Sequence, residues 1–273
     1  QGRGRYHIYE TNDAEILQAE RIMDWAQRIQ NAFESNLYRV FLQKIVNRDR
    51  QLIGYEALVR MQDETGKIIP PGSFMPAVKR MGWNGRVDQW MLDTVIKSAE
   101  FQQLKQSTHG KIYMSINLDA KSIGDVSFSQ WMLALLDDCD IDRGMLRFEI
   151  TEMEQLQGTE TEVHLIDELT RRGYRVWLDD FGTGYNSFDL LKRLKVHGIK
   201  IDTSFTRDLL SDPINRALVD AVVTIGKMQN LEIVAEGVET EEIYAALLEM
   251  GVNAFQGHLF HAAEPAQQVF AHI

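Results

Sequence analysis

The sequence has few of the features that mark secreted or membrane-spanning chains. It contains a single cysteine, Cys139, which excludes an internal disulfide and a metal site built from several cysteines. No apolar run approaches the roughly 18 to 20 residues that span a bilayer, and no apolar signal segment is present. We therefore predict a soluble fragment without membrane contact in a reducing cytoplasm, although the full-length parent could be anchored in the inner membrane.

Basic residues are scarce relative to acidic ones. The 273 residues include 29 Lys and Arg against 40 Asp and Glu, for a net charge of −11. Because affinity for a nucleic acid polymer comes mainly from clustered Lys and Arg, this balance argues against such a partner. The hydrophobic fraction of 44% is ordinary for a globular protein, and we find neither an internal repeat nor a low-complexity segment. One large domain is the economical interpretation.

The apolar pattern alternates between strand-like and helix-like segments. Runs rich in β-branched residues predict eight strands, at 39–46, 51–61, 112–118, 146–151, 175–179, 198–202, 232–236 and 254–260. Helix-spaced apolar residues lie between them, at 87–95, 131–136, 163–169, 218–225 and 243–247. Strands that alternate with helices predict an α/β fold, here a TIM-type (β/α)8 barrel. Because residues 47–50 are too few for a helical crossover, the first two strands should form a hairpin, which makes one strand antiparallel.

Polar side chains stand at or near the ends of these predicted strands. They are Glu56, Asn117, Glu149, Asp179, Asp180, Lys200, Glu236 and Gln256. Strand ends meet at the C-terminal mouth of such a barrel, so we expect these residues to gather there. Their carboxylates would repel an anionic substrate unless bound cations reversed the local charge. Because the ligands are oxygen donors without a matched His pair, Mg²⁺ or Mn²⁺ is favoured over Zn²⁺.

The tripeptide Glu56-Ala57-Leu58 and the motifs after it resemble the EAL family, phosphodiesterases that hydrolyse the bacterial second messenger cyclic di-GMP. The later motifs, in order, are Ser115-Ile116-Asn117-Leu118, Phe148-Glu149-Ile150-Thr151-Glu152, Asp179-Asp180-Phe181-Gly182-Thr183-Gly184-Tyr185, Ile199-Lys200-Ile201-Asp202, Ala235-Glu236-Gly237-Val238-Glu239-Thr240 and Gln256-Gly257. The resemblance extends from about residue 20 to the end. It implies a modified TIM barrel with one antiparallel strand and hydrolysis to the linear dinucleotide 5'-pGpG.

The resemblance also implies a role for each motif residue. Glu56, Asn117, Glu149 and Asp179 would hold one ion, Asp179 and Asp180 a second, and Glu236 would be a ligand of the second ion or a base. Lys200 would orient the attacking water, with Gln256 beside it. Leu58 and Arg60 would contact the substrate, and Glu152 would anchor the loop after Asp180. The ions would be Mg²⁺ or Mn²⁺, with Ca²⁺ inhibitory.

The chain before the barrel carries two further expectations. Apolar residues at helical spacing, among them Ile22, Ala26, Ile29 and Phe33, predict a linker helix over 13–36. Residues 1–12 resemble the end of a GGDEF cyclase domain, which implies an upstream GGDEF or sensor domain, with the EAL barrel over 37–273. By the same resemblance we expect a homodimer that forms through Ser187 to Leu194.

Two other functions fit parts of the sequence. A catalytically weak EAL domain could bind cyclic di-GMP as a receptor, although such receptors typically lack one or more of the ligands that are present here. A barrel aldolase could use Lys200 as a Schiff-base nucleophile, but the carboxylates expected around it would keep the amine charged. His258 and His261 lack partners at ligand spacing, so we expect them to pack or to lie at the rim.

Overall fold

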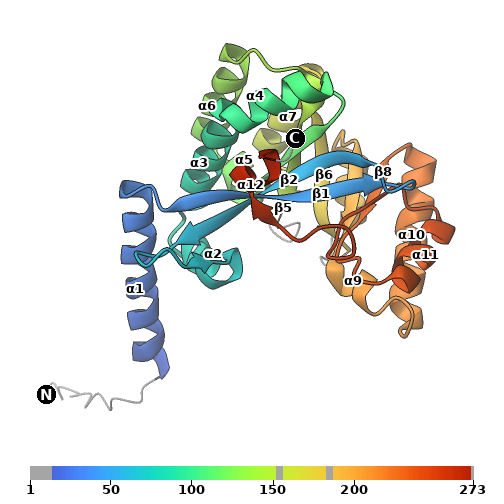
Figure 1. Ribbon diagram of the computed structural model, residues 1–273, viewed down its shortest axis with the longest axis horizontal. Coiled ribbons are helices and arrows are strands. Elements are labelled where there is room, and N and C mark those ends of the chain that lie inside the picture. Colours follow the sequence, from blue (N-terminus) through green and yellow to red (C-terminus); the bar gives the residue numbers. More distant parts are fainter. Residues whose placement is uncertain (1–13, 152–155, 183–186, 272–273) are drawn as a thin grey trace, which may run out of the picture. The chain divides into compact units, whose positions relative to one another are not determined.

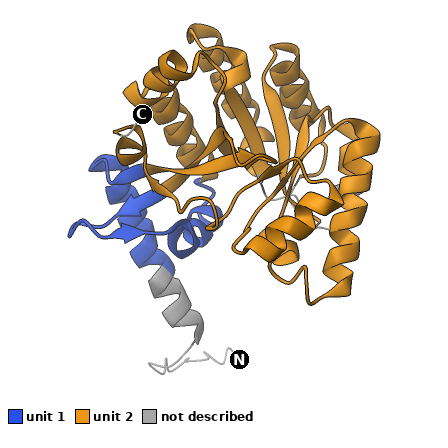
Figure 2. Ribbon diagram, turned by 45° about the vertical axis from the view of Figure 1, so that its right-hand side comes forward, with its two compact units in different colours: residues 1–39, 60–83 blue, residues 40–59, 84–273 orange. Residues whose placement is uncertain are grey.

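The computed structural model describes residues 14–151, 156–182 and 187–271. These residues form two compact units (Figure 2). The smaller unit contains the described residues up to Arg39 together with 60–83, and the larger contains 40–59 and the chain from Asn84 onward. Strands β1 (Tyr38–Asn47) and β2 (Leu52–Gln62) contribute residues to both. The predicted divisions at residues 12 and 36 stay predictions.

The sheet closes into a barrel of eight strands within the described part of the chain. After β1 and β2 come β4 (Tyr113–Asp119), β5 (Leu146–Thr151), β6 (Arg175–Phe181), β7 (Gly198–Ile201), β8 (Glu232–Ala235) and β9 (Ala254–Phe255). Neighbours from β2 through β9 pair in parallel, whereas β1 pairs antiparallel with β9 and closes the barrel on β2. The predicted modified TIM barrel with one antiparallel strand is confirmed.

The last barrel strand is shorter than the predicted run of 254–260. The chain turns directly after Gln256, where the amides of Phe260 and His261 both donate to the carbonyl of Gly257. A Cβ atom on Gly257 would lie 2.1 Å from the Val238 carbonyl oxygen, so only glycine fits this approach. Two short strands, β3 (Ile68–Ile69) and β10 (Glu264–Pro265), extend the sheet beyond the barrel.

Helices follow the strands as the apolar spacing predicted (Figure 1). The predicted ones are α3 (Asn84–Lys97), α6 (Val126–Asp138), α7 (Glu160–Arg171), α10 (Pro213–Gln229) and α11 (Glu241–Met250). Further short helices were not predicted: α4 (Ala99–Thr108), α5 (Ala120–Ile123), η1 (Arg143–Met145), α8 (Ser187–Arg193), α9 (Thr203–Arg207) and α12 (Ala266–Phe270). In α10 the buried face contains Val219, Val222 and Val223, whereas Leu218, at the start of the apolar spacing predicted over 218–225, is 40% exposed.

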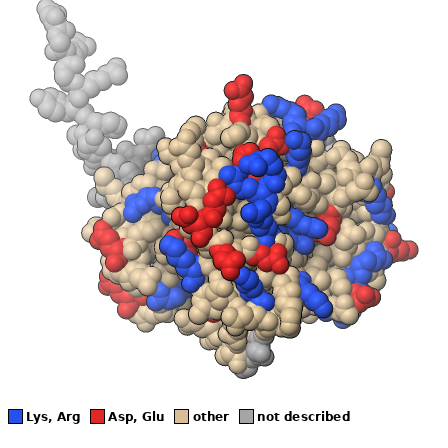
Figure 3. Space-filling model, turned by 90° about the horizontal axis from the view of Figure 1, so that it is seen from above, with Lys and Arg blue, Asp and Glu red and all other residues tan. Residues whose placement is uncertain are grey.

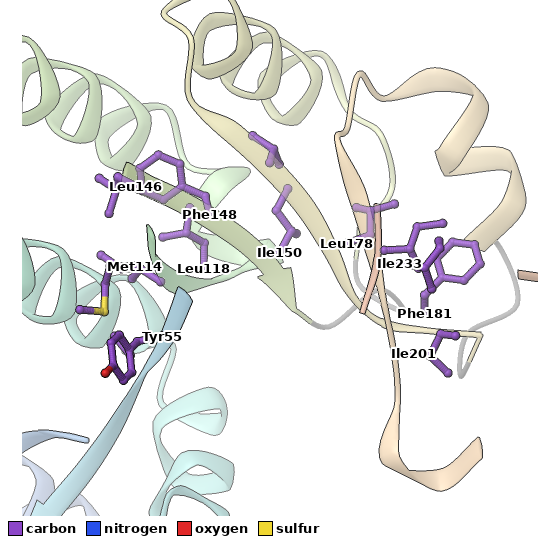
Figure 4. Packing of buried hydrophobic residues seen from close by; sticks show 14 of the residues in the cluster. Tyr55, Met114, Leu118, Leu146, Phe148, Ile150, Leu178, Phe181, Ile201 and Ile233 are labelled. Carbon is purple, nitrogen blue, oxygen red and sulfur yellow. The ribbon is translucent and has the colours of Figure 1, made fainter. Parts of the chain in front are cut away.

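Along the barrel strands, successive side chains point alternately into the hydrophobic core and into the barrel interior. Leu146, Phe148 and Ile150 of β5 are buried in the hydrophobic core (Figure 4). Because successive side chains of a strand point to opposite faces, the intervening Arg147 and Glu149 lie on the other face, toward the barrel interior. The same alternation in the neighbouring strands brings polar side chains inside the barrel.

Arg147 occupies the barrel interior near the amino ends of the strands. Its guanidinium lies 3.5 Å from the ring centroid of Tyr113 and 5.1 Å from that of Trp177. Its Nη1 atom also forms an ion pair with Glu232 at 2.9 Å. Stacking and pairing hold this cation although its side chain is only 12% exposed. Side chains therefore fill the barrel at the amino ends of the strands, and a functional site is expected at the carboxyl ends.

The smaller unit contains the predicted N-terminal helix. Helix α1 (Ala14–Glu34) buries Ile29, and the ring of Phe33 lies 4.8 Å from that of Tyr38. Tyr38 in turn lies 5.9 Å from Phe74 of helix α2 (Pro71–Arg80), so aromatic packing joins the elements of this unit. Met23 on α1 is 75% exposed. Among the described helices, none combines the length and apolar character needed to cross a bilayer.

Candidate active site

Lys200 is the centre of the site at the carboxyl ends of the strands. Its Nζ atom lies 2.5 Å from Glu236, 2.8 Å from Glu149, 3.1 Å from Glu56 and 3.5 Å from Asp179. The lysine is completely buried at the end of β7. One ammonium therefore faces four carboxylates from four different strand ends, as the barrel topology predicted.

Two amides hold the carboxylate of Glu56. Asn117 Nδ2 donates to its Oε1 at 2.5 Å, and Gln256 Nε2 donates to its Oε2 at 2.6 Å. The Gln256 amide also donates to Gln43 Oε1 at 2.9 Å, and Gln43 Nε2 donates to the backbone oxygen of His261 at 3.1 Å. These bonds connect β1, β2, β4 and the chain after β9, so the orientation of Glu56 is fixed from several sides.

A local irregularity in β6 brings two consecutive aspartates to one side. Adjacent residues of a regular strand would point apart, but Asp180 has φ +52°, and the β6–β7 register shifts between Leu178 and Phe181. Asp179 and Asp180 consequently group with Glu236, with one oxygen of each within 4.8 Å of the others. The turn that brings both carboxylates to this side lies within β6, at Asp180.

Burial and charge set the protonation of these groups. Burial lowers the pKa of Lys200, but Asp179, Glu149, Glu236 and Glu56 together raise it well above its ordinary value. The amine therefore stays charged, which disfavours the Schiff-base alternative. Burial raises the pKa of Glu149 to about 8, and it raises that of Glu236 too.

The neighbouring acids differ in direction. Burial and then the charge of Asp179 raise the pKa of Asp180 to about 7. Burial likewise raises the pKa of Asp179. For Glu56 burial acts upward, but the charge of Lys200 and the two amide hydrogen bonds outweigh it and lower the pKa. Glu56 is therefore held as a carboxylate, whereas Glu149 and Asp180, with pKa values of about 8 and about 7, take up protons near neutral pH.

The donor set fits divalent cations. Glu56, Glu149 and Asp179 form one group with oxygens within 4.8 Å of one another, and Asp179, Asp180 and Glu236 form another. The Oδ1 atom of Asn117 is buried and accepts no hydrogen bond from the described residues. Carboxylates in excess over one lysine, with a buried amide oxygen beside them, suit Mg²⁺ or Mn²⁺. Asp179 belongs to both groups, as a bridging ligand would.

A cavity of about 340 Å³ opens over these residues. Its walls include Glu56, Asp179, Glu236 and Gln256, and also Leu58, which we expected to contact substrate. Gln43, Thr203 and Glu239 also line this cavity, although we predicted no role for them from the sequence. Thr203 directly follows the motif that ends at Asp202, Glu239 lies within the motif that begins at Ala235, and Gln43 lies on the antiparallel strand, so each offered only a weak signal. His258 is exposed and lines the cavity, as expected of a rim residue.

Two predicted residues are not placed at the site. Arg60 belongs to the smaller unit, so its position relative to the cavity stays a prediction. Glu152 lies outside the described residues, so its role as a loop anchor stays a prediction. Elsewhere, charges of both signs are interspersed on the face shown in Figure 3. Among the ion pairs of the described residues, Arg172 pairs with both Asp137 and Glu168.

Comparison with known proteins gives a consistent result. The family model described as the EAL domain matches residues 26–265. The bifunctional diguanylate cyclase/cyclic di-GMP phosphodiesterase MucR of Pseudomonas aeruginosa is 30% identical over 275 residues, which cover 100% of this chain and 39% of that protein. The cyclic di-GMP phosphodiesterase PdeF of Escherichia coli is 31% identical over 87% of this chain and 31% of its own length. The chain thus spans less than half of these relatives.

Solved structures share the fold. The PaMucR phosphodiesterase in complex with c-di-GMP superposes with a TM-score of 0.82 at 30% identity, covering 90% of this chain and 99% of that chain. The EAL enzyme Bd1971 with cAMP and cyclic di-GMP bound has a TM-score of 0.86 at 24% identity, covering 94% of this chain and 69% of that chain. The barrel, the grouped carboxylates and the match over residues 26–265 agree, and this chain belongs to the EAL domain family.

Proposed function

We propose that this chain hydrolyses cyclic di-GMP to linear 5'-pGpG with the aid of two divalent cations. The observation that carries the proposal is the pair of carboxylate groups that share Asp179 at the barrel mouth. The similarity to MucR and PdeF, both named as cyclic di-GMP phosphodiesterases, supports the substrate. So does the likeness to PaMucR, whose structure contains c-di-GMP.

The residues divide between the two cations as follows. Glu56, Asn117, Glu149 and Asp179 would hold the first, and Asp179, Asp180 and Glu236 the second. When bound, Mg²⁺ or Mn²⁺ ions offset the charge of the phosphodiester and make a water molecule more acidic. We propose that Ca²⁺ inhibits, because it prefers longer bonds and roughly 6 to 8 ligands and would misplace the reacting groups.

The chain's own groups orient and stabilise the reactants. Lys200 is a fixed cation at 2.5 Å from Glu236, where it would hold the attacking water and stabilise charge that develops on the phosphate. In the alternative in which Glu236 does not hold the second cation, its carboxylate would instead accept a proton from that water. Gln256 has a buried Oε1 atom without a hydrogen-bond donor among the described residues, and this oxygen could accept a hydrogen bond from the same water.

Other predicted roles complete the proposal. Leu58 at the cavity wall would contact the guanine-containing substrate, and Arg60 would contact one phosphate. Glu152 would anchor the loop after Asp180. The activity would take place in the cytoplasm, where an upstream GGDEF or sensor domain of the longer protein would control it.

We also propose a homodimer, with an interface different from the one that the sequence suggested. Leu190 and Leu191 of α8 are buried in the core of the chain itself and are not available to a partner. Leu210 and Ile214, by contrast, are 55% and 68% exposed. Ile214 and Leu218 are four residues apart and share one face of α10, and Leu210 lies in the turn just before this helix, which favours this face as the contact.

The test separates an enzyme from a receptor. The chain is incubated with cyclic di-GMP and Mg²⁺ or Mn²⁺, with and without a chelator, and the nucleotides are separated by chromatography. The proposal predicts 5'-pGpG that disappears with the chelator. Tight binding of cyclic di-GMP without product would establish the receptor instead.

A further inference from the structure

The short helix α9 connects the Lys200 strand to the backbone of Glu236. Its residue Thr206 is completely buried, and Thr206 Oγ1 donates to the carbonyl oxygen of Glu236 at 2.5 Å. The same hydroxyl lies 3.1 Å from the carbonyl of Thr203, one turn earlier. A hydroxyl carries one hydrogen, and the shorter contact is the one to Glu236.

Glu236 depends on contacts from outside its own strand. It is the first residue beyond β8, and its amide donates to Ile201 at 3.1 Å. Its carbonyl receives the Thr206 hydroxyl. The next residue, Gly237, has φ +61°, and a Cβ atom there would lie 2.4 Å from Thr203 Cγ2. The peptide after Glu236 is thus held between β7 and α9 in a conformation that glycine permits.

We propose that Thr206 is a positioning residue that orients Glu236 toward the second cation. This inference rests on the proposed two-cation function. A valine of the same shape would fill the space but could not donate, so the Glu236 peptide would lose one of its two fixed points. Within the described residues, α9 makes no hydrogen bond to Glu56, Asn117 or Glu149. The effect should therefore be confined to the second cation.

The test compares Thr206→Val with Thr206→Ser by Mn²⁺ titration calorimetry on the otherwise intact chain. Because Thr206→Val removes one hydrogen bond, we expect it to bind the second Mn²⁺ roughly three- to tenfold more weakly than wild type. The affinity for the first Mn²⁺ should be unchanged. In Thr206→Ser the affinity for the second Mn²⁺ should be within about twofold of wild type, because serine keeps the hydroxyl donor. Thr170→Val, which removes a hydroxyl that donates to the Lys195 carbonyl at 3.3 Å, is the matched control and should change neither cation.

Each outcome decides between the possibilities. Equal second-site affinity in Thr206→Val and wild type overturns the positioning role. An equal decrease in Mn²⁺ affinity at both sites also overturns it, and so does an equal decrease in the Val and Ser variants. Either result would indicate general structural damage. A wild-type protein that binds no Mn²⁺ overturns the proposed function itself, and the role of Thr206 with it.

Discussion

Replacing Lys200 with methionine tests the electrostatic balance of the site. Methionine keeps an unbranched side chain but removes the only cation that lies among Glu56, Glu149, Asp179 and Glu236 in the described residues. Loss of one partner of a buried ion pair costs about 3 to 5 kcal/mol, because the remaining charge is left unpaired. In a chain of this size each kcal/mol shifts the melting temperature by roughly 2 to 4 °C. We therefore expect cation-free Lys200→Met to melt about 10 °C below wild type at pH 8.

Both pH and bound cations should change the difference in melting temperature between Lys200→Met and wild type. At pH 6 Glu149, whose pKa is about 8 even beside Lys200, is protonated, so fewer buried charges remain unpaired and the difference should narrow. Saturating Mg²⁺ should also narrow the difference in melting temperature at pH 8, because the cations supply the missing positive charge. Turnover should nevertheless fall by at least roughly 10²-fold, because Lys200 stabilises the developing charge.

Thermal unfolding followed by circular dichroism measures this directly, at pH 6 and pH 8, with chelator or with Mg²⁺. Lys195→Met is the matched control, since Lys195 pairs with Asp167 at 3.1 Å on the surface and is 72% exposed. Lys195→Met should have the same melting temperature as wild type under all conditions. An unchanged melting temperature for Lys200→Met, or a decrease as large at pH 6 as at pH 8, would contradict the proposed electrostatic role of Lys200.

Three further predictions follow from the same structure. Glu56→Ala, Asp179→Ala and Glu236→Ala should each reduce turnover by at least roughly 10²-fold, measured as 5'-pGpG formed; near wild-type rates would remove these residues from the mechanism. Cation affinity should rise between pH 6 and pH 8, because Glu149 and Asp180, with pKa values of about 8 and about 7, must release protons to bind a cation; calorimetry that finds no pH dependence would contradict this. Asp88 is buried with its pKa raised to about 7, so its contribution to stability falls as pH rises from about 4 to 7. Asp88→Asn should therefore be more stable than wild type at pH 8 by a few kcal/mol, on the order of 1.4 for each unit of the shift, and little different near pH 4; equal urea midpoints at pH 8 would count against it.

The sequence predicted those parts of the site that depend on periodicity. Strand runs that end in Glu149, Asp179 or Lys200 need only alternation and the rule that barrel mouths gather strand ends. The assignment of Asp179 to both cations came from the resemblance to the EAL family and not from periodicity. What periodicity could not predict was the positive φ of Asp180 within β6, because such a conformation in a non-glycine residue depends on tertiary context.

Contacts between distant segments were beyond the sequence. The Gln43–Gln256 hydrogen bond joins residues 213 positions apart, and the Thr206–Glu236 bond depends on a five-residue helix without an apolar period of its own. The predicted strand over 254–260 failed because the apolar pattern continues through a turn that Gly257 imposes. Leu218 misled in the opposite way, since an apolar residue on a helix is not always on its buried face.

The proposed two-cation phosphodiesterase activity depends above all on the carboxylate of Asp179, which belongs to both carboxylate groups. Its most direct test is to measure Mn²⁺ stoichiometry and cyclic di-GMP turnover together, in wild type and in Asp179→Asn. We predict two Mn²⁺ ions and 5'-pGpG production for wild type, and loss of at least one ion together with turnover for the variant. A wild-type protein that turns over cyclic di-GMP with one ion or none, or an Asp179→Asn variant that keeps both ions and full turnover, would contradict the claim.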